Sequence, residues 1–68
     1  MKFNATIFGE KIKEKRIFCK MSIRDLSAKT FISPATLCRI ENGRKPDIDN
    51  ALALAHWYGV DLYFFTKN

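Results

Sequence analysis

The sequence predicts an all-α fold, a compact five-helix bundle that forms one domain over residues 1–68. Apolar residues recur at steps of three and four through almost the whole chain, which is the spacing of helices that bury one face. Capping residues and glycines interrupt this spacing, and they mark the ends of successive helices. Hydrophobic residues make up 47% and charged residues 28% of the chain, a composition typical of a globular domain rather than a disordered one.

The first helix is expected from about Thr6 to Phe18, with a short link at Lys20-Met21 after it. One apolar stripe at helical steps predicts its inner face. The stripe contains Phe8, Ile12, Arg16 and Cys19, and it is widened by Ile17 and Phe18.

The second helix is expected over Ile23–Lys29, with Ile23, Leu26 and Thr30 along its inner edge. Ser22 precedes it as the cap, because its hydroxyl can accept a hydrogen bond from a backbone amide of the first turn. Asp25 stands three residues later and can reach back to the Ser22 amide, which makes a capping box with Asp in place of the usual Glu.

The third helix is expected over Pro34–Asn42, and Ser33-Pro34 is the strongest local signal in the chain. Serine is a preferred cap, and proline at the first helical position lacks an amide that would have no partner in any case. Leu37 and Ile40 are expected inside, and Gly43 ends the helix in a left-handed conformation.

The fourth helix is expected over Asn50–Tyr58, capped by Asp49 and ended by Gly59. A short fifth helix, Leu62–Phe65, follows the cap Asp61, and the tail Thr66–Asn68 is expected to fray. The predicted apolar face of the fourth helix consists of Ala51 or Leu52, Leu54, Ala55 and Tyr58.

The charge balance suggests a polyanionic partner, because 12 Lys and Arg against 7 Asp and Glu give a formal net charge of +5. Many soluble proteins carry such a charge without any anionic ligand, so this observation leaves both interpretations open. The basic residues of the first third form either a solvated helix face or a surface near phosphates. They are Lys2, Lys11, Lys13, Lys15, Arg16 and Lys20.

The sequence gives no support for an enzyme, a metal or a cofactor. Cys19 and Cys38 lack metal-ligand spacing, and we expect both as small hydrophobes in buried or half-buried positions. His56 is the one histidine, and no serine and aspartate are arranged around it as a convincing catalytic set. The sequence also contains no phosphate-loop motif. No apolar run reaches the length of a membrane span and Met1–Ala5 lacks the apolar region of a signal peptide, so a cytoplasmic location is expected.

Residues 22–43 fit the plan of a helix-turn-helix, in which two short helices are joined by a turn of about four residues. The stretches Ser22–Lys29 and Ile32–Gly43 also resemble the helix-turn-helix of the Cro/CI phage-repressor family, a large bacterial and phage group also called XRE. Arg39–Gly43 is similar to the most recognisable stretch of that family. The resemblance extends from Phe8 to Phe65, and it implies a λ-repressor-like bundle and a sequence-specific DNA-binding transcriptional regulator.

The resemblance also implies roles for individual residues toward double-stranded DNA. Arg39 would contact bases and is suited to a bidentate contact with guanine. The other residues at base-facing positions are Pro34, Ala35 and Thr36, of which Ala35 or the Thr36 methyl group suits a thymine methyl. Phosphate contacts are implied for Ser22, Ser33, Asn42, Arg44 and Lys45. Arg16 and Glu41 match an ion pair that bridges the first and third helices in the family; a purely structural purpose for this pair stays open.

Two positions depart from the family pattern. The family usually has glycine where this chain has Phe31, because the turn needs a left-handed backbone that is costly for phenylalanine. We therefore expect another turn geometry, with the Phe31 side chain packed inward or capping the core. Ser27 replaces the alanine that the family favours at a tight helix crossing.

A homodimer on a palindromic operator is expected, because one recognition helix covers only a few base pairs. The aromatic C-terminal region offers the surface, and we predict that Tyr63, Phe64 and Phe65 contribute to the dimer contact; the alternative is that two of them close the core. No small-molecule ligand is evident. Two other functions remain open: an antitoxin or similar protein-interaction module, with an apolar surface away from the third helix, and a DNA-coating protein with little sequence preference.

Overall fold

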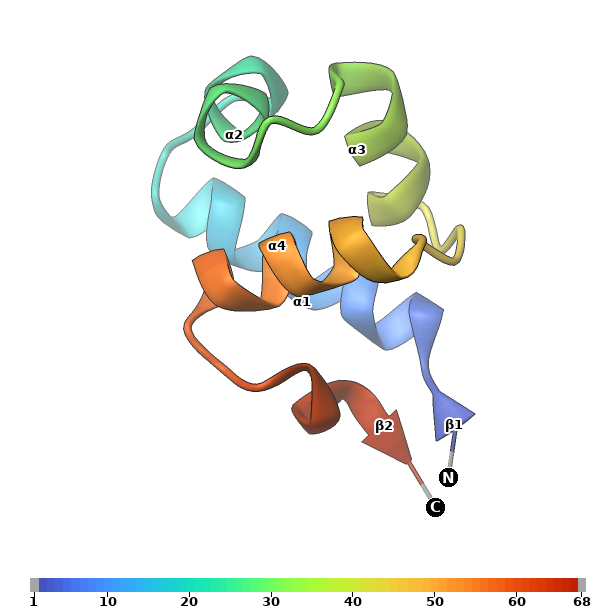
Figure 1. Cartoon of the computed structure of the whole chain (residues 1–68). Coiled ribbons are helices and arrows are strands. Elements are labelled where there is room, and N and C mark those ends of the chain that lie inside the picture. Colours follow the sequence, from blue (N-terminus) through green and yellow to red (C-terminus); the bar gives the residue numbers. More distant parts are fainter. Residues whose placement is uncertain (1, 68) are drawn as a thin grey trace.

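The computed structural model describes residues 2–67 and contains four α-helices and one 3₁₀ helix within this range. The elements in chain order are β1 (Lys2–Phe3), α1 (Ala5–Phe18), α2 (Ile23–Thr30), α3 (Pro34–Glu41), α4 (Ile48–Tyr58), η1 (Leu62–Phe65) and β2 (Thr66–Lys67). The helices surround one core, with α2 and α3 at one end of the molecule (Figure 1). The all-α prediction is confirmed, but the fifth α-helix is wrong, because η1 has only four residues and forms the tighter 3₁₀ turn.

The two ends of the chain pair with each other in a short antiparallel sheet. Lys2 lies opposite Lys67 and Phe3 opposite Thr66, and the Asn4 amide donates to the Phe65 carbonyl at 3.0 Å. The expectation of a frayed tail is therefore wrong for Thr66 and Lys67, while Asn68 lies outside the described residues. Two-residue strands carry no periodic pattern, so this pairing follows from the packing that brings both ends to one side of α1 (Figure 1).

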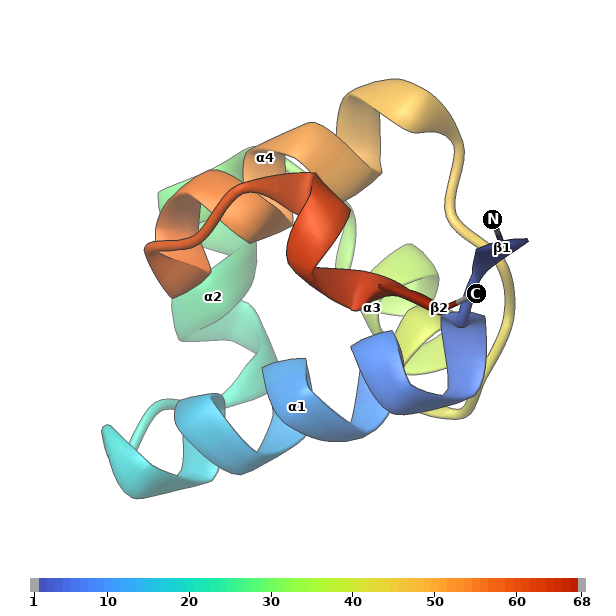
Figure 2. The ribbon, with the colours of Figure 1, turned by 90° about the horizontal axis from the view of Figure 1, so that it is seen from below.

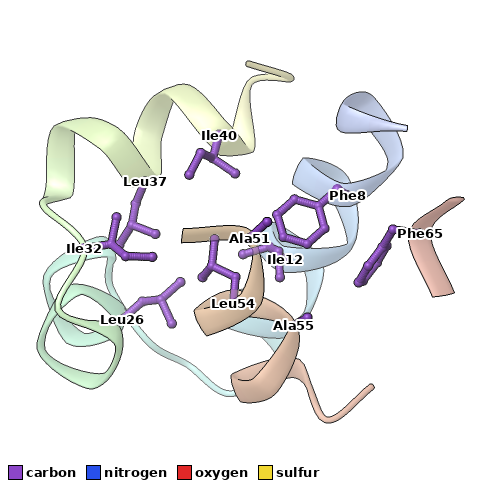
Figure 3. Packing of buried hydrophobic residues seen from close by; sticks show 10 residues of the cluster. All are labelled: Phe8, Ile12, Leu26, Ile32, Leu37, Ile40, Ala51, Leu54, Ala55 and Phe65. Atoms are coloured by element: carbon purple, nitrogen blue, oxygen red, sulfur yellow. The ribbon is translucent and has the colours of Figure 1, made fainter. Parts of the chain in front are cut away.

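The core consists of apolar side chains that converge from all four α-helices, from the turn before α3 and from η1 (Figure 3). Phe8 and Phe65 meet at the right-hand side of this view, with ring centroids 4.7 Å apart and an angle of 88° between the rings, an edge-to-face arrangement that aromatic pairs favour. The buried members are Phe8, Ile12, Leu26, Ile32, Leu37, Ile40, Ala51, Leu54, Ala55 and Phe65.

The helix boundaries differ from the predicted ones by one residue in α1, α2 and α3, a normal uncertainty at helix ends. The start of α4 is a larger correction, because Asp47 and not Asp49 is the cap. The Asp47 carboxylate accepts from the Asn50 amide at 2.8 Å, which places Ile48 at the first helical position. Asp49 then lies in the first turn, where its charge favours the helix dipole.

The last turn of α1 projects beyond the core, which overturns the predicted inner stripe there (Figure 2). Cys19 and Cys38 are both exposed, so the expectation that they are buried or half buried is wrong. Ile17 is 56% and Phe18 86% exposed. The reason is that the chain leaves the helix at Cys19 and turns through Lys20, whose φ is 59°, before any other element covers this end.

Lys15 makes a contact with the C-terminal end of α4 that the sequence pattern does not indicate. Its ammonium group donates to the carbonyl oxygens of Trp57 at 3.3 Å and Tyr58 at 2.8 Å, and it lies 5.2 Å from the centroids of both rings. A cation at a helix C-terminus satisfies carbonyls that have no partner within the helix. Lys15 therefore fastens α1 to the end of α4 and is not simply a solvated charge.

Phe31 keeps the left-handed backbone that the family's glycine would adopt, with φ 62° and ψ 24°. Its side chain is 94% exposed, so the expectation of another turn geometry, with Phe31 packed inward or capping the core, is wrong. The Phe31 amide donates to the Ser27 carbonyl at 2.8 Å and closes the end of α2. The turn geometry is therefore fixed by the helices on either side, and the phenylalanine adopts it at a conformational cost.

Replacing Phe31 with glycine is expected to raise the free energy of unfolding by about 1 kcal/mol. The left-handed region costs a non-glycine residue roughly 1–2 kcal/mol, the greater freedom of glycine in the unfolded chain offsets part of that gain, and the exposed ring contributes little burial. Thermal unfolding should shift upward by about 4–8 °C. Phe31→Ala is the matched control, since alanine keeps the strain, and equal stability of the two variants would contradict this explanation.

Candidate nucleic-acid interface

The structure confirms the two predicted helix caps, Ser22 before α2 and Ser33 before α3. At the start of α2, the Asp25 amide donates to the Ser22 hydroxyl at 3.0 Å and the Ser22 amide donates to the Asp25 carboxylate at 2.9 Å. This is the predicted capping box. Ile32 in the turn is 4% exposed, so its side chain anchors the connection between the two helices in the core.

The start of α3 combines a proline with a hydroxyl pair. Ser33 accepts from the Thr36 amide at 3.2 Å, and its hydroxyl donates to the Thr36 hydroxyl oxygen at 2.9 Å. Pro34 and Ala35 are exposed and Thr36 is half buried. Pro34 has no amide and the Thr36 amide is used by the cap, so the Ala35 amide is the donor of this turn left for an outside acceptor, beside side chains small enough to allow a close approach.

α3 has an inner face that packs against the core and an outer face that is exposed to solvent. Leu37 and Ile40 are 0% and 1% exposed and hold the helix against the core. The opposite side forms an open groove of about 610 Å³ that continues into the loop after the helix. Its lining residues are Ala35, Cys38, Arg39, Asn42, Gly43, Arg44 and Lys45.

The groove brings together five of the residues that the sequence predicts as DNA contacts. Among the described residues, the exposed cations Arg39, Arg44 and Lys45 form no ion pair with an acidic side chain, so their charges are available to an anionic partner. Ser22 and Ser33 lie outside the groove, at the starts of α2 and α3, where their oxygens accept from backbone amides. Pro34 and Thr36 are also outside it.

Asn42 and Cys38 are linked within this face. The Asn42 side-chain amide donates to the Cys38 carbonyl at 2.9 Å and lies 3.7 Å from the Cys38 sulfur. Both of these contacts use the amide as donor, which leaves its oxygen as the part of the side chain without a partner among the hydrogen bonds of the described residues. Cys38 itself was not among the predicted contacts; the signal that could have found it is its spacing of three from Ala35 and four from Asn42.

The Arg16–Glu41 ion pair joins α1 to the end of α3, as the resemblance implies. Two parallel hydrogen bonds connect the guanidinium to the carboxylate, from Nε to Oε2 at 2.7 Å and from Nη2 to Oε1 at 2.9 Å. Nη1 donates to the Met21 carbonyl at 2.9 Å. The side chains are only 13% and 5% exposed, and hydrogen bonding to Glu41 raises the pKa of the Arg16 guanidinium above its ordinary value against the opposing effect of burial.

A second open groove lies between the start of α4 and η1, next to the first, and Lys45 lines both. Its volume is about 590 Å³, and its apolar lining includes Ile48, Leu62 and Tyr63. Tyr63 and Phe64 are each 61% exposed, whereas Phe65 is 2% exposed and packs against Phe8. Phe65 therefore belongs to the core, and its prediction as a dimer contact is wrong. Tyr63 and Phe64 remain accessible.

The described residues contain no group of three or more His, Cys, Asp or Glu side chains placed to hold a metal ion. None of their helices is long and apolar enough to cross a membrane. The surface features on which a binding function can be argued include the cationic groove along α3, the apolar groove near η1 and the exposed apolar end of α1.

The two packed helices, the short turn and the exposed cationic face of the second helix define a DNA-binding helix-turn-helix protein. A family model described as Helix-turn-helix matches residues 12–65. The chain therefore belongs to the helix-turn-helix family of the Cro/CI, or XRE, type. Comparisons with curated proteins and with solved structures gave no significant match.

Proposed function

We propose that the protein is a transcriptional repressor or Cro-like switch protein, which binds a palindromic operator as a homodimer and acts by binding rather than by catalysis. The observation that carries this proposal is the groove along α3, where Ala35 and Arg39 share one face with the cations Arg44 and Lys45. Such a face combines groups that can contact base edges with groups that neutralise phosphates, and sequence-specific binding needs both.

In the proposed complex α3 lies in the major groove with its N-terminal half at the base edges. Arg39 donates in a bidentate manner to guanine, and Ala35 offers a small apolar contact to a thymine methyl. Arg44 and Lys45 contact the backbone just beyond the helix, while the caps Ser22 and Ser33 bring the starts of α2 and α3 near phosphates. Arg16 and Glu41 hold α1 and α3 in the geometry that these contacts require.

The homodimer is proposed to form through the apolar groove near η1. Ile48 is 63% and Tyr63 is 61% exposed, and both line this groove. Exposed apolar patches of this kind mark interaction surfaces when they gather in one place. A two-fold dimer would double the number of base and phosphate contacts and match a palindromic site.

Replacing Tyr63 with lysine is expected to weaken self-association about tenfold or more, because the change places a charge in the apolar contact. Sedimentation equilibrium over micromolar concentrations measures the effect. Leu52→Lys is the control, since Leu52 is 50% exposed on α4 but does not line the groove. A wild-type protein that stays monomeric at high micromolar concentration, or equal weakening by both variants, would contradict the proposed surface.

The proposed function is tested by selecting duplexes from a random library with the purified wild-type protein and sequencing the bound fraction. We expect one enriched sequence with two-fold symmetry, bound about a thousandfold more tightly than a shuffled duplex. The absence of any enriched sequence, with binding that depends on salt alone, would instead support the DNA-coating alternative.

The exposed end of α1 favours a second candidate function, a protein-interaction module such as an antitoxin. Ile17 and Phe18 form an apolar surface on α1 rather than on α3, as that alternative predicts. Co-purification with the product of a neighbouring gene, lost in Phe18→Ser but kept in Arg39→Ala, would support it. Retention of that product by both variants would contradict a role for this surface.

A further inference from the structure

We infer that Cys38 is a specificity-determining residue of the DNA-reading surface, a role that rests on the proposed function. The first observation is its place on α3. Residues three, four and seven positions apart lie on one face of a helix, and Ala35 is followed at these steps by Cys38, Arg39 and Asn42. All four line the same groove.

The second observation is the orientation of α3. Leu37 and Ile40 fix the helix against the core, so it cannot rotate about its own axis relative to the rest of the domain without losing that packing. Cys38 is exposed on this outer face. Any placement of α3 that brings Ala35 and Arg39 to base edges therefore brings the Cys38 thiol to the same groove of the DNA.

The third observation is the hydrogen bonding of Cys38. The Asn42 side-chain amide donates to the Cys38 carbonyl at 2.9 Å and to the Cys38 sulfur at 3.7 Å, so the sulfur lies beside the Asn42 amide on the outer face of α3. A thiol is small, largely apolar and only a weak donor. It suits a close contact with a thymine methyl better than a hydrogen bond to a base edge.

The test compares the operator sequences selected by wild-type protein and by Cys38→Gln. Glutamine can donate to and accept from adenine in the major groove, so we expect the preferred base to change at one pair in each half-site. The positions read by Arg39 should stay the same. His56→Gln, a change at an exposed residue of α4, is the matched control and should select the wild-type sequence.

Chemical protection gives a second readout that does not depend on the selected sequence. In Cys19→Ser protein, Cys38 is the only thiol, and saturating operator DNA should slow its alkylation by iodoacetamide about tenfold or more. A single thiol introduced as His56→Cys into protein that carries Cys19→Ser and Cys38→Ser should react at the same rate with and without DNA.

Identical selected sequences for wild type and Cys38→Gln, or unchanged alkylation of Cys38 in a saturated complex, would overturn this inference and leave the proposed function intact. A wild-type protein that selects no sequence at all would overturn both. Alkylation that is slowed equally at Cys38 and at the control thiol would also count against the inference, since it would indicate general shielding.

Discussion

The Gly9→Ala variant is expected to lose more than about 4 kcal/mol of stability, a size that single substitutions rarely reach. A Cβ atom at Gly9 would overlap the Ile40 carbonyl oxygen and would lie 3.2 Å from backbone atoms of Glu41. Backbone cannot move aside as a flexible side chain can, so α1 and α3 would have to separate. Domains of this size have total stabilities of only about 3–10 kcal/mol, and most of the variant should be unfolded.

Urea unfolding followed by circular dichroism measures this effect. The sign of the change in stability is informative. Alanine is intrinsically better than glycine inside a helix by about 1 kcal/mol, so Gly9→Ala would stabilise the protein if α1 did not contact α3 at this point. Gly59→Ala is the control: its Cβ meets nothing within 4 Å, and its φ of +96° alone is unfavourable. A Gly9→Ala variant as stable as Gly59→Ala would show that α1 and α3 do not touch at this point.

The Glu41→Ala variant is expected to lose about 3 kcal/mol, the lower end of the cost of breaking a buried ion pair, because the pair is only partly buried and the remaining charge loses its partner. Arg16 is 13% exposed, and its guanidinium would keep only the Met21 carbonyl as an acceptor. Glu41→Gln keeps a hydrogen-bond acceptor of the same shape and should lose less. A loss below about 1 kcal/mol in Glu41→Ala would indicate that the pair is solvated like a surface pair.

The contribution of the Arg16 charge should not vary over the usual pH range. Its pKa is raised in the folded protein, chiefly by the hydrogen bond to Glu41. A group with a raised pKa contributes its stability fully below the unfolded pKa and loses it only as pH rises through the folded value. Both values lie far above neutral pH for arginine.

Much of the fold could be predicted from the sequence because capping residues, a proline and glycines mark the ends of its helices. Ser22 with Asp25, Ser33 with Pro34, and Gly43 are local signals, and the structure places helix ends within two residues of them. The start of α4 was misplaced because Asp47 and Asp49 are both good caps, and only packing selects between them. The β1–β2 pair joins the two ends of the described chain, a long-range contact that no local pattern encodes.

The site was predicted less completely, for a physical reason that differs from residue to residue. Arg16 and Glu41 are far apart in sequence, and the resemblance rather than the spacing indicated their pairing. Cys38 was assigned to the interior because cysteine is usually buried, although its position relative to Leu37 and Ile40 places it outside. Phe65 was grouped with Tyr63 by composition, whereas its contact with Phe8 depends on how the chain turns after Gly59.

The central claim is that the exposed face of α3 reads a DNA sequence. The most direct test measures fluorescence anisotropy of the selected operator and a shuffled duplex, at several salt concentrations, with wild-type, Arg39→Ala and Arg44→Ala proteins. Arg39→Ala should weaken operator binding about 10- to 100-fold and relax the preference for one base pair, whereas Arg44→Ala, at a residue that lines the cationic groove but not the proposed dimer groove, should weaken both duplexes alike and reduce the salt slope by about one. Equal effects of the two variants on both duplexes would contradict base reading by α3.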